Sequence, residues 1–127
     1  MVNKRIIEEW MVIAKEDFEL ATHLIEEAWF YRQALSHLQQ AVEKYTKAFL
    51  ISKDWELRKI HDLETLFDEA SEYESLFKNY LDFGRELTAY YTETRYPPLL
   101  DSDVSKKDAE RLLKIAKEFV EKIKSLL

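Results

Sequence analysis

The sequence predicts an all-α fold, an antiparallel up-and-down four-helix bundle with an additional short helix. Apolar residues recur every three or four positions along four long segments, which is the pattern of helices that each bury one face. The 127 residues include one glycine and two prolines, too few turn-forming residues for a fold of many short strands. The length fits a single domain, residues 1–127, with one core.

The expected helices follow one another with two longer connections, at residues 53–60 and 93–104. By residue number, the predicted segments are about 3–27, about 31–52, a shorter one starting near 61, about 74–92, and 105 to the C-terminus. Ser105 followed three residues later by Asp108 resembles a capping box. Asp62, in the first turn of the short helix, favours the helix dipole. Gly84 lies inside the fourth helix, where we expect it to allow a close helix contact.

Composition excludes several classes of protein. The chain has no cysteine and a net charge of −6, from 25 acidic and 19 basic residues, which argues against broad electrostatic binding of nucleic acid. Charges occur too early at the N-terminus for a secretion signal, and no apolar run reaches the ~20 residues of a membrane span. We therefore expect a cytoplasmic protein that makes no membrane contact. A single glycine excludes a phosphate-binding glycine loop, and the three histidines form no ligand motif, so no cofactor and no metal are expected.

Asp17 breaks the apolar stripe of the first helix, where a hydrophobic residue is expected. A buried carboxylate needs a partner. In one interpretation Asp17 pairs with a nearby Arg, Lys or Tyr and fixes the helix register. In the other it lines an internal or dimer-interface pocket.

The second helix carries a polar stripe with a spacing of four, three and four residues, formed by Ser36, Gln40, Glu43 and Lys47. Lys44 lies beside it. The simpler interpretation is a solvated face with an i, i+4 pair between Glu43 and Lys47. The alternative is that the two lysines and the glutamine hold phosphate groups.

The only two prolines, Pro97 and Pro98, follow Arg95 and Tyr96. Because a proline disfavours helix at the residue before it, the chain is predicted to leave the fourth helix here in an extended form. Arg95 then either caps the end of that helix, where free carbonyls carry partial negative charge, or points its guanidinium at a phosphate or carboxylate with Tyr91 nearby.

Three stretches together resemble the HEPN family, the higher eukaryote and prokaryote nucleotide-binding domain. Residues 14–50 contain the pattern Ala-x-x-Asp and then Gln-x-x-Glu-Lys-x-x-Lys-Ala, residues 59–67 contain His-Asp-Leu, and residues 87–99 contain Tyr-x-x-x-Arg-Tyr-Pro. The resemblance covers nearly the whole chain. It implies a bundle of four or five helices that commonly forms a homodimer, and small members are often encoded beside a minimal nucleotidyltransferase in a toxin–antitoxin-like pair.

Many HEPN proteins are metal-independent RNases marked by Arg, four to six residues, and then His. This chain has no histidine at that distance after Arg95, so we expect no catalytic residue of that kind. The resemblance thus favours a nucleotide-binding and interaction module, with candidate ligand-binding residues Arg95, Tyr91, Tyr96, Lys44, Lys47 and Asp17. The alternatives are an RNase toxin with a degenerate motif and a purely structural dimerisation domain.

Overall fold

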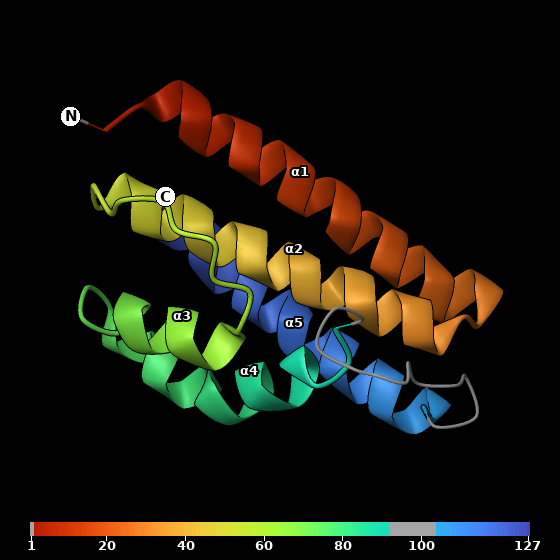
Figure 1. Cartoon of the computed structure of the whole chain (residues 1–127). Coiled ribbons are helices and arrows are strands. Elements are labelled where there is room, and N and C mark those ends of the chain that lie inside the picture. The colour runs from red at the N-terminus through yellow and green to blue at the C-terminus, as the bar shows by residue number, and fades with distance from the viewer. Residues whose placement is uncertain (1, 92–103) are drawn as a thin grey trace.

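The computed structural model describes residues 2–91 and 104–127, which contain five α-helices, two short helical turns and no strand. The helices are α1 (Lys4–His23), α2 (Tyr31–Ser52), α3 (Leu63–Ala70), α4 (Leu81–Thr88) and α5 (Lys106–Leu126). The helices α1, α2, α4 and α5 alternate in direction along the chain, and α3 is the additional short helix (Figure 1). The predicted all-α bundle is confirmed.

Three helices begin at a polar side chain that caps them. The Oδ1 atom of Asn3 accepts hydrogen bonds from the backbone N–H groups of Arg5 and Ile6 at 3.0 and 3.3 Å. Asp62 accepts from the N–H of Glu64 at 3.1 Å at the start of α3, and Ser105 accepts from the N–H of Asp108 at 3.0 Å at the start of α5. These bonds satisfy backbone donors that have no partner within the helix. The cap predicted at Ser105 is confirmed, and a helix starts near residue 61 as predicted, although Asp62 caps α3 and does not lie in its first turn.

At the end of the first helix, the chain changes from α-helical to π-helical geometry before it reaches α2. A π-helical turn, Leu24–Ala28, follows α1, and Trp29 then adopts the left-handed conformation with φ 61°. The N–H of Phe30 donates to the carbonyl of Leu24 at 3.0 Å, which closes the wider turn. The predicted helix at residues 3–27 therefore ends its regular α-helical part at His23.

The predicted fourth helix, residues 74–92, is shorter and begins more tightly wound than expected. A 3-10 helix, Ser75–Tyr80, precedes α4, and α4 ends at Thr88. The 3-10 geometry places residues three apart on one side, which lets both Phe77 and Tyr80 be buried. Turn bonds then carry the chain out of the helix, and Tyr91 donates its N–H to the carbonyl of Thr88 at 3.0 Å.

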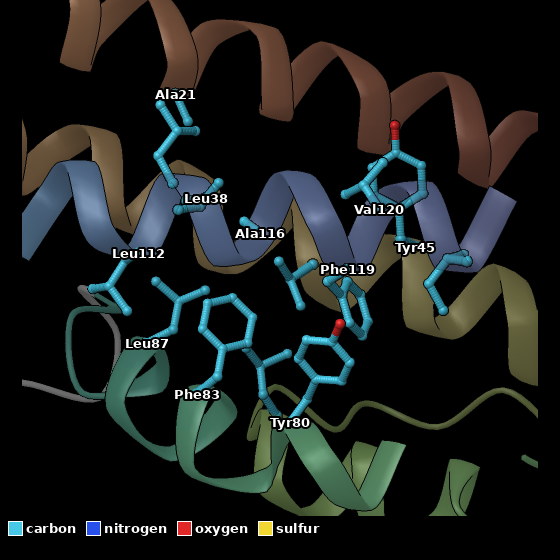
Figure 2. Packing of buried hydrophobic residues seen from close by; sticks show 14 of the residues in the cluster. Ala21, Leu38, Tyr45, Tyr80, Phe83, Leu87, Leu112, Ala116, Phe119 and Val120 are labelled. Atoms are coloured by element: carbon cyan, nitrogen blue, oxygen red, sulfur yellow. The ribbon is translucent and has the colours of Figure 1, made fainter. Parts of the chain in front are cut away.

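Within the core, several aromatic rings gather around Phe119 of α5. Figure 2 shows Tyr80 and Phe83 pointing toward this ring from the segment that leads into α4 and from α4 itself. The ring centroids of Tyr80, Phe67 and Phe77 lie 5.1, 5.3 and 5.9 Å from that of Phe119, distances typical of favourable aromatic packing. Such a cluster fixes how α3, α4 and α5 pack together.

Gly84 allows α4 to approach α3 closely, as predicted. A Cβ atom at this position would lie 2.8 Å from Cε2 of Phe67 and 3.2 Å from Cβ of Leu63. The ring of Phe67 is fully buried. Glycine therefore fits this contact because it has no side chain.

Helix α2 is the central element of the molecule. It lies between α1 on one side and the layer of α3 and α4 on the other, and α5 runs beside it (Figure 1). Its buried residues include five polar ones, Ser36, Gln39, Glu43, Thr46 and Lys47. In the described part of the chain, no helix has the length and apolar character needed to span a bilayer.

Candidate functional site: a buried polar cluster on α2

The structure describes four of the six predicted site residues. Asp17 lies on α1, Lys44 and Lys47 lie on α2, and Tyr91 follows α4. Arg95 and Tyr96, together with Pro97 and Pro98, lie outside the described residues. The predictions for that stretch, including the cap and the extended turn, therefore stay predictions.

Asp17 pairs across the interface between α1 and α2. Its Oδ2 atom accepts a hydrogen bond from Nζ of Lys44, and its Oδ1 atom lies 3.3 Å from Nδ1 of His37. The Asp17 side chain is 15% exposed and that of Lys44 is 22% exposed. The structure therefore supplies the basic partner that one interpretation of Asp17 requires, and we call Asp17, His37 and Lys44 the α1–α2 triad.

A second polar group is more deeply buried. Nζ of Lys47 donates to Oε2 of Glu43 at 2.9 Å, and Nδ1 of His61 lies 3.1 Å from Oε1 and 3.2 Å from Oε2 of the same carboxylate. Both α2 side chains are buried, whereas that of His61 is 44% exposed. We call Glu43, Lys47 and His61 the buried cluster.

Two further residues, the buried Gln39 and the half-buried Trp10, hold this cluster in place. The side-chain amide of Gln39, which is fully buried one turn before Glu43, donates to the carbonyl oxygen of His61 at 2.7 Å. The ammonium group of Lys47 also lies 5.9 Å from the centre of the Trp10 ring on α1, within the range of a cation–π contact. The cluster thus joins α1, α2 and the connection that leads to α3.

Tyr91 lies against the open side of the buried cluster. Its ring centroid is 5.6 Å from that of His61, with an angle of 40° between the planes, and the residue is buried. Tyr91 is also the last described residue before the stretch that contains Arg95 and Tyr96. The structure thus brings one predicted site residue, Tyr91, together with His61, which was predicted to lie near the start of the short helix and was not among the candidate site residues.

The polar stripe on α2 is not a solvated face. The predicted i, i+4 pair between Glu43 and Lys47 forms, but both residues are buried, as is Ser36. The interpretation of a solvated stripe is therefore wrong, because α1 and the connection before α3 cover it. Lys44 and Lys47 also point to different carboxylates, Asp17 and Glu43, so the structure does not gather them into one cationic pocket.

Sequence reasoning did not identify the site residues Gln39, Glu43 and His61 as a set. Periodicity alone cannot show that a residue on α2 meets a loop 18 or 22 positions further along the chain. A signal was nevertheless present, because Glu43 and His61 belong to two separate motifs by which the sequence resembles HEPN proteins.

The chemistry open to this arrangement follows from the hydrogen bonds. A carboxylate only accepts, so the Glu43 contact places a hydrogen on Nδ1 of His61 and directs Nε2 away from α2. Residues 2–91 and 104–127 contain no group of three or more His, Asp or Glu side chains placed to hold a metal ion.

These observations define an all-helical bundle with a polar cluster buried on its central helix. A family model described as the HEPN domain matches residues 7–126. The chain therefore belongs to the HEPN domain family.

Two solved structures share this fold. The crystal structure of TT1696 from Thermus thermophilus superposes with a TM-score of 0.82 at 21% identity, over 95% of this chain and 98% of that one. The structure of ST0689, an archaeal HEPN homologue, superposes with a TM-score of 0.74 at 23% identity, over 94% and 95% of the two chains. A comparison with curated proteins finds no match.

Proposed function

We propose that this HEPN chain forms a homodimer that acts as a nucleotide-binding and interaction module. The observation that carries the proposal is the buried cluster with Tyr91 packed against it. Burying an ion pair brings little net stability, so stability alone does not explain why Glu43 and Lys47 are buried here. Of the candidate ligand-binding residues, Tyr91 packs against this cluster and Arg95 and Tyr96 follow it by a few positions, whereas Lys44, Lys47 and Asp17 are engaged in ion pairs.

An exposed apolar stripe on α1 supports the homodimer. Ile6, Ile13 and Leu20 are 40%, 46% and 41% exposed, and residues seven apart differ by only about 20° around a helix. The stripe is symmetric about Ile13. A second copy with its α1 antiparallel would therefore place Ile6 of each copy against Leu20 of the other, as a two-fold axis requires.

Light scattering tests the homodimer. The proposed assembly has twice the mass of the 15.3 kDa chain, and a wild-type mass of one chain would contradict it. Ile13→Glu should produce monomers, because it places a charge at the centre of the apolar stripe. Leu57→Glu is the matched control, since Leu57 is equally exposed but lies in the connection between α2 and α3.

Thermal melting tests nucleotide binding. A ligand that binds only the folded state raises the melting temperature, so a nucleoside monophosphate or triphosphate should stabilise the wild type, and Arg95→Ala should reduce that shift. If no nucleotide or short RNA shifts the wild-type melt and Arg95→Ala lowers the melting temperature by itself, Arg95 is a helix cap and the binding proposal fails.

The interaction partner that we propose is a minimal nucleotidyltransferase, as the other half of a toxin–antitoxin-like pair. The net charge of −6 suits binding to a protein partner better than binding to protein-free nucleic acid. Co-expression with a nucleotidyltransferase encoded by an adjacent gene should give a complex that stays together on a sizing column. Clean separation of the two chains would contradict this partnership. RNA cleavage without metal that is lost in Arg95→Ala would instead favour an RNase toxin.

A further inference from the structure

His61 is held at both its backbone and its ring. Gln39 donates to its carbonyl oxygen at 2.7 Å, and Glu43 holds Nδ1 at 3.1 Å. Tyr91 packs against one side of the ring. With its ring held by one buried carboxylate and its backbone by one buried amide, His61 loses little conformational freedom when it binds a ligand, which is the property of a preorganised contact.

The other ring nitrogen of His61 is Nε2. Among residues 2–91 and 104–127, no hydrogen bond to Nε2 is present, and the side chain is 44% exposed. Because Glu43 holds Nδ1, the ring geometry directs Nε2 away from this carboxylate.

The two lysines of the same region, Lys44 and Lys47, are poorly placed to contact a bound ligand. Lys47 is almost completely buried against Glu43, and Lys44 is paired with Asp17. The charges of Glu43 and Lys47 offset each other behind His61, so an approaching anion meets little net negative charge there. His61 is thus the basic side chain of the buried cluster that is both exposed and fixed.

From this geometry we infer that His61 contacts the phosphate group of the nucleotide through Nε2, with Glu43 and Gln39 as positioning residues. The inference rests on the proposed nucleotide-binding function and assigns its phosphate contact to a residue outside the predicted set. A doubly protonated imidazole donates from Nε2 and carries a positive charge, so it forms a charge-assisted hydrogen bond to a phosphate oxygen. A neutral imidazole held by Glu43 at Nδ1 has only a lone pair at Nε2 and would repel that oxygen.

Binding should therefore weaken as the pH rises and imidazole loses its charge. The titratable and charged groups that face His61 are Glu43 and Lys47 on α2 and Tyr91 after α4. Asp62, the next residue in the chain, is turned toward the start of α3, where it accepts from the N–H of Glu64 and from Oγ1 of Thr65. Of these groups, histidine is the type that ordinarily changes charge near neutral pH.

The test is calorimetric titration of the full chain with the dinucleotide UpU. Its single phosphodiester keeps one negative charge between about pH 5.5 and pH 8, so a change in affinity over that range reports on the protein. We expect the wild type to bind UpU about tenfold more weakly at about pH 8 than at about pH 5.5. His61→Gln should bind UpU weakly with no pH dependence. Uridine, which lacks the phosphate, should bind weakly at both pH values, and inorganic phosphate should compete with UpU.

His23→Gln is the matched control, because His23 is exposed at the end of α1 and lies in neither the buried cluster nor the α1–α2 triad. It should keep the wild-type affinity and pH profile. An unchanged affinity and pH profile in His61→Gln would overturn the inference while leaving nucleotide binding intact. Absence of UpU binding by the wild type would also overturn it, and the wider function fails only if nucleotides do not shift the thermal melt either.

A measurement on the unmodified protein covers the case in which His61→Gln does not fold. The ring-proton NMR signal of His61 should move when UpU is added, whereas that of His23 should not. A His61 signal that stays in place while UpU binds would overturn the inference.

Discussion

Nζ of Lys47 donates a hydrogen bond to Oε2 of Glu43 at 2.9 Å, one turn apart on α2, and their side chains are 4% and 7% exposed. Pairs with this spacing are common on helix surfaces, where they contribute only a few tenths of a kcal/mol. Here the pair lies inside the protein and also engages His61. Removing one partner would leave an uncompensated charge in the core.

Glu43→Ala should lower the free energy of unfolding by about 3–5 kcal/mol, because the buried ammonium group of Lys47 would lose its counter-ion. Urea denaturation measures the change. Glu118→Ala is the matched control, since Glu118 pairs with Lys122 at the same spacing on α5 but in solvent. It should leave the unfolding curve close to that of the wild type, and equal effects of the two substitutions would contradict the buried pair.

A double-mutant cycle tests the link between Asp17 and Lys44. Because both side chains are mostly buried, we expect a coupling energy of about 1–3 kcal/mol from Asp17→Ala, Lys44→Ala and the double variant. The pair between Glu26 and Lys117 is about half exposed on each side and serves as the comparison, with an expected coupling below about 1 kcal/mol. A negligible coupling for Asp17 and Lys44 would show that their contact does not stabilise the helix register.

Gly84→Ala should destabilise the protein by about 1 kcal/mol or more. The added Cβ would lie 2.8 Å from a carbon of the Phe67 ring, and overpacking a core costs about 1–3 kcal/mol, which outweighs the gain of up to about 1 kcal/mol from the higher helix propensity of alanine. Phe67→Leu in the same chain should reduce the effect of Gly84→Ala, as a double-mutant cycle by urea denaturation would reveal. Increased stability of Gly84→Ala would mean that the two helices are not in close contact.

Tyr45 should make the protein sensitive to alkali. Burial raises the pKa of its hydroxyl group, and the charges of Glu19 and Glu121 raise it further. The pKa of Tyr45 in the folded state lies above the unfolded value of about 10. The stability that the neutral hydroxyl group contributes is therefore fully present below about pH 10, and it is lost as the pH rises through the folded pKa. Tyr45→Phe should therefore lose less stability than the wild type between about pH 9 and pH 11.

Tyr73→Phe is the control for this experiment, since Tyr73 is 46% exposed. Urea denaturation across the alkaline range should give the same loss of stability for Tyr73→Phe as for the wild type. Identical curves for Tyr45→Phe and the wild type would contradict a titrating group at Tyr45.

The fold was predictable because its signals are local. Helical spacing of apolar residues predicted the bundle, and the cap residues Asp62 and Ser105 marked two helix starts correctly. The helix ends were less predictable, since the left-handed Trp29 and the 3-10 segment before α4 depend on how their neighbours pack. Gly84 is an intermediate case, in which a single rare residue indicated a close contact without naming its partner.

The candidate site was less predictable because its contacts are distant in the sequence. Asp17 was recognised as a misfit on an apolar stripe, and the sequence indicated the class of partner but not Lys44 itself. Glu43 and Lys47 were interpreted as a surface pair, because helical periodicity does not reveal which polar face another segment covers. His61 meets Glu43 only through the path of the connection between α2 and α3.

The central position of α2 also determines where the sequence has room to vary. Nearly every residue from Ala34 to Leu50 is buried, so almost any exchange there disturbs an interface with α1, α3, α4 or α5. In a saturation mutagenesis library selected for folded protein, variants should be depleted along α2 and tolerated on the outer faces of α1 and α5. The helix that is least open to substitution thus also carries Glu43 and Lys47 of the buried cluster and His37 and Lys44 of the α1–α2 triad.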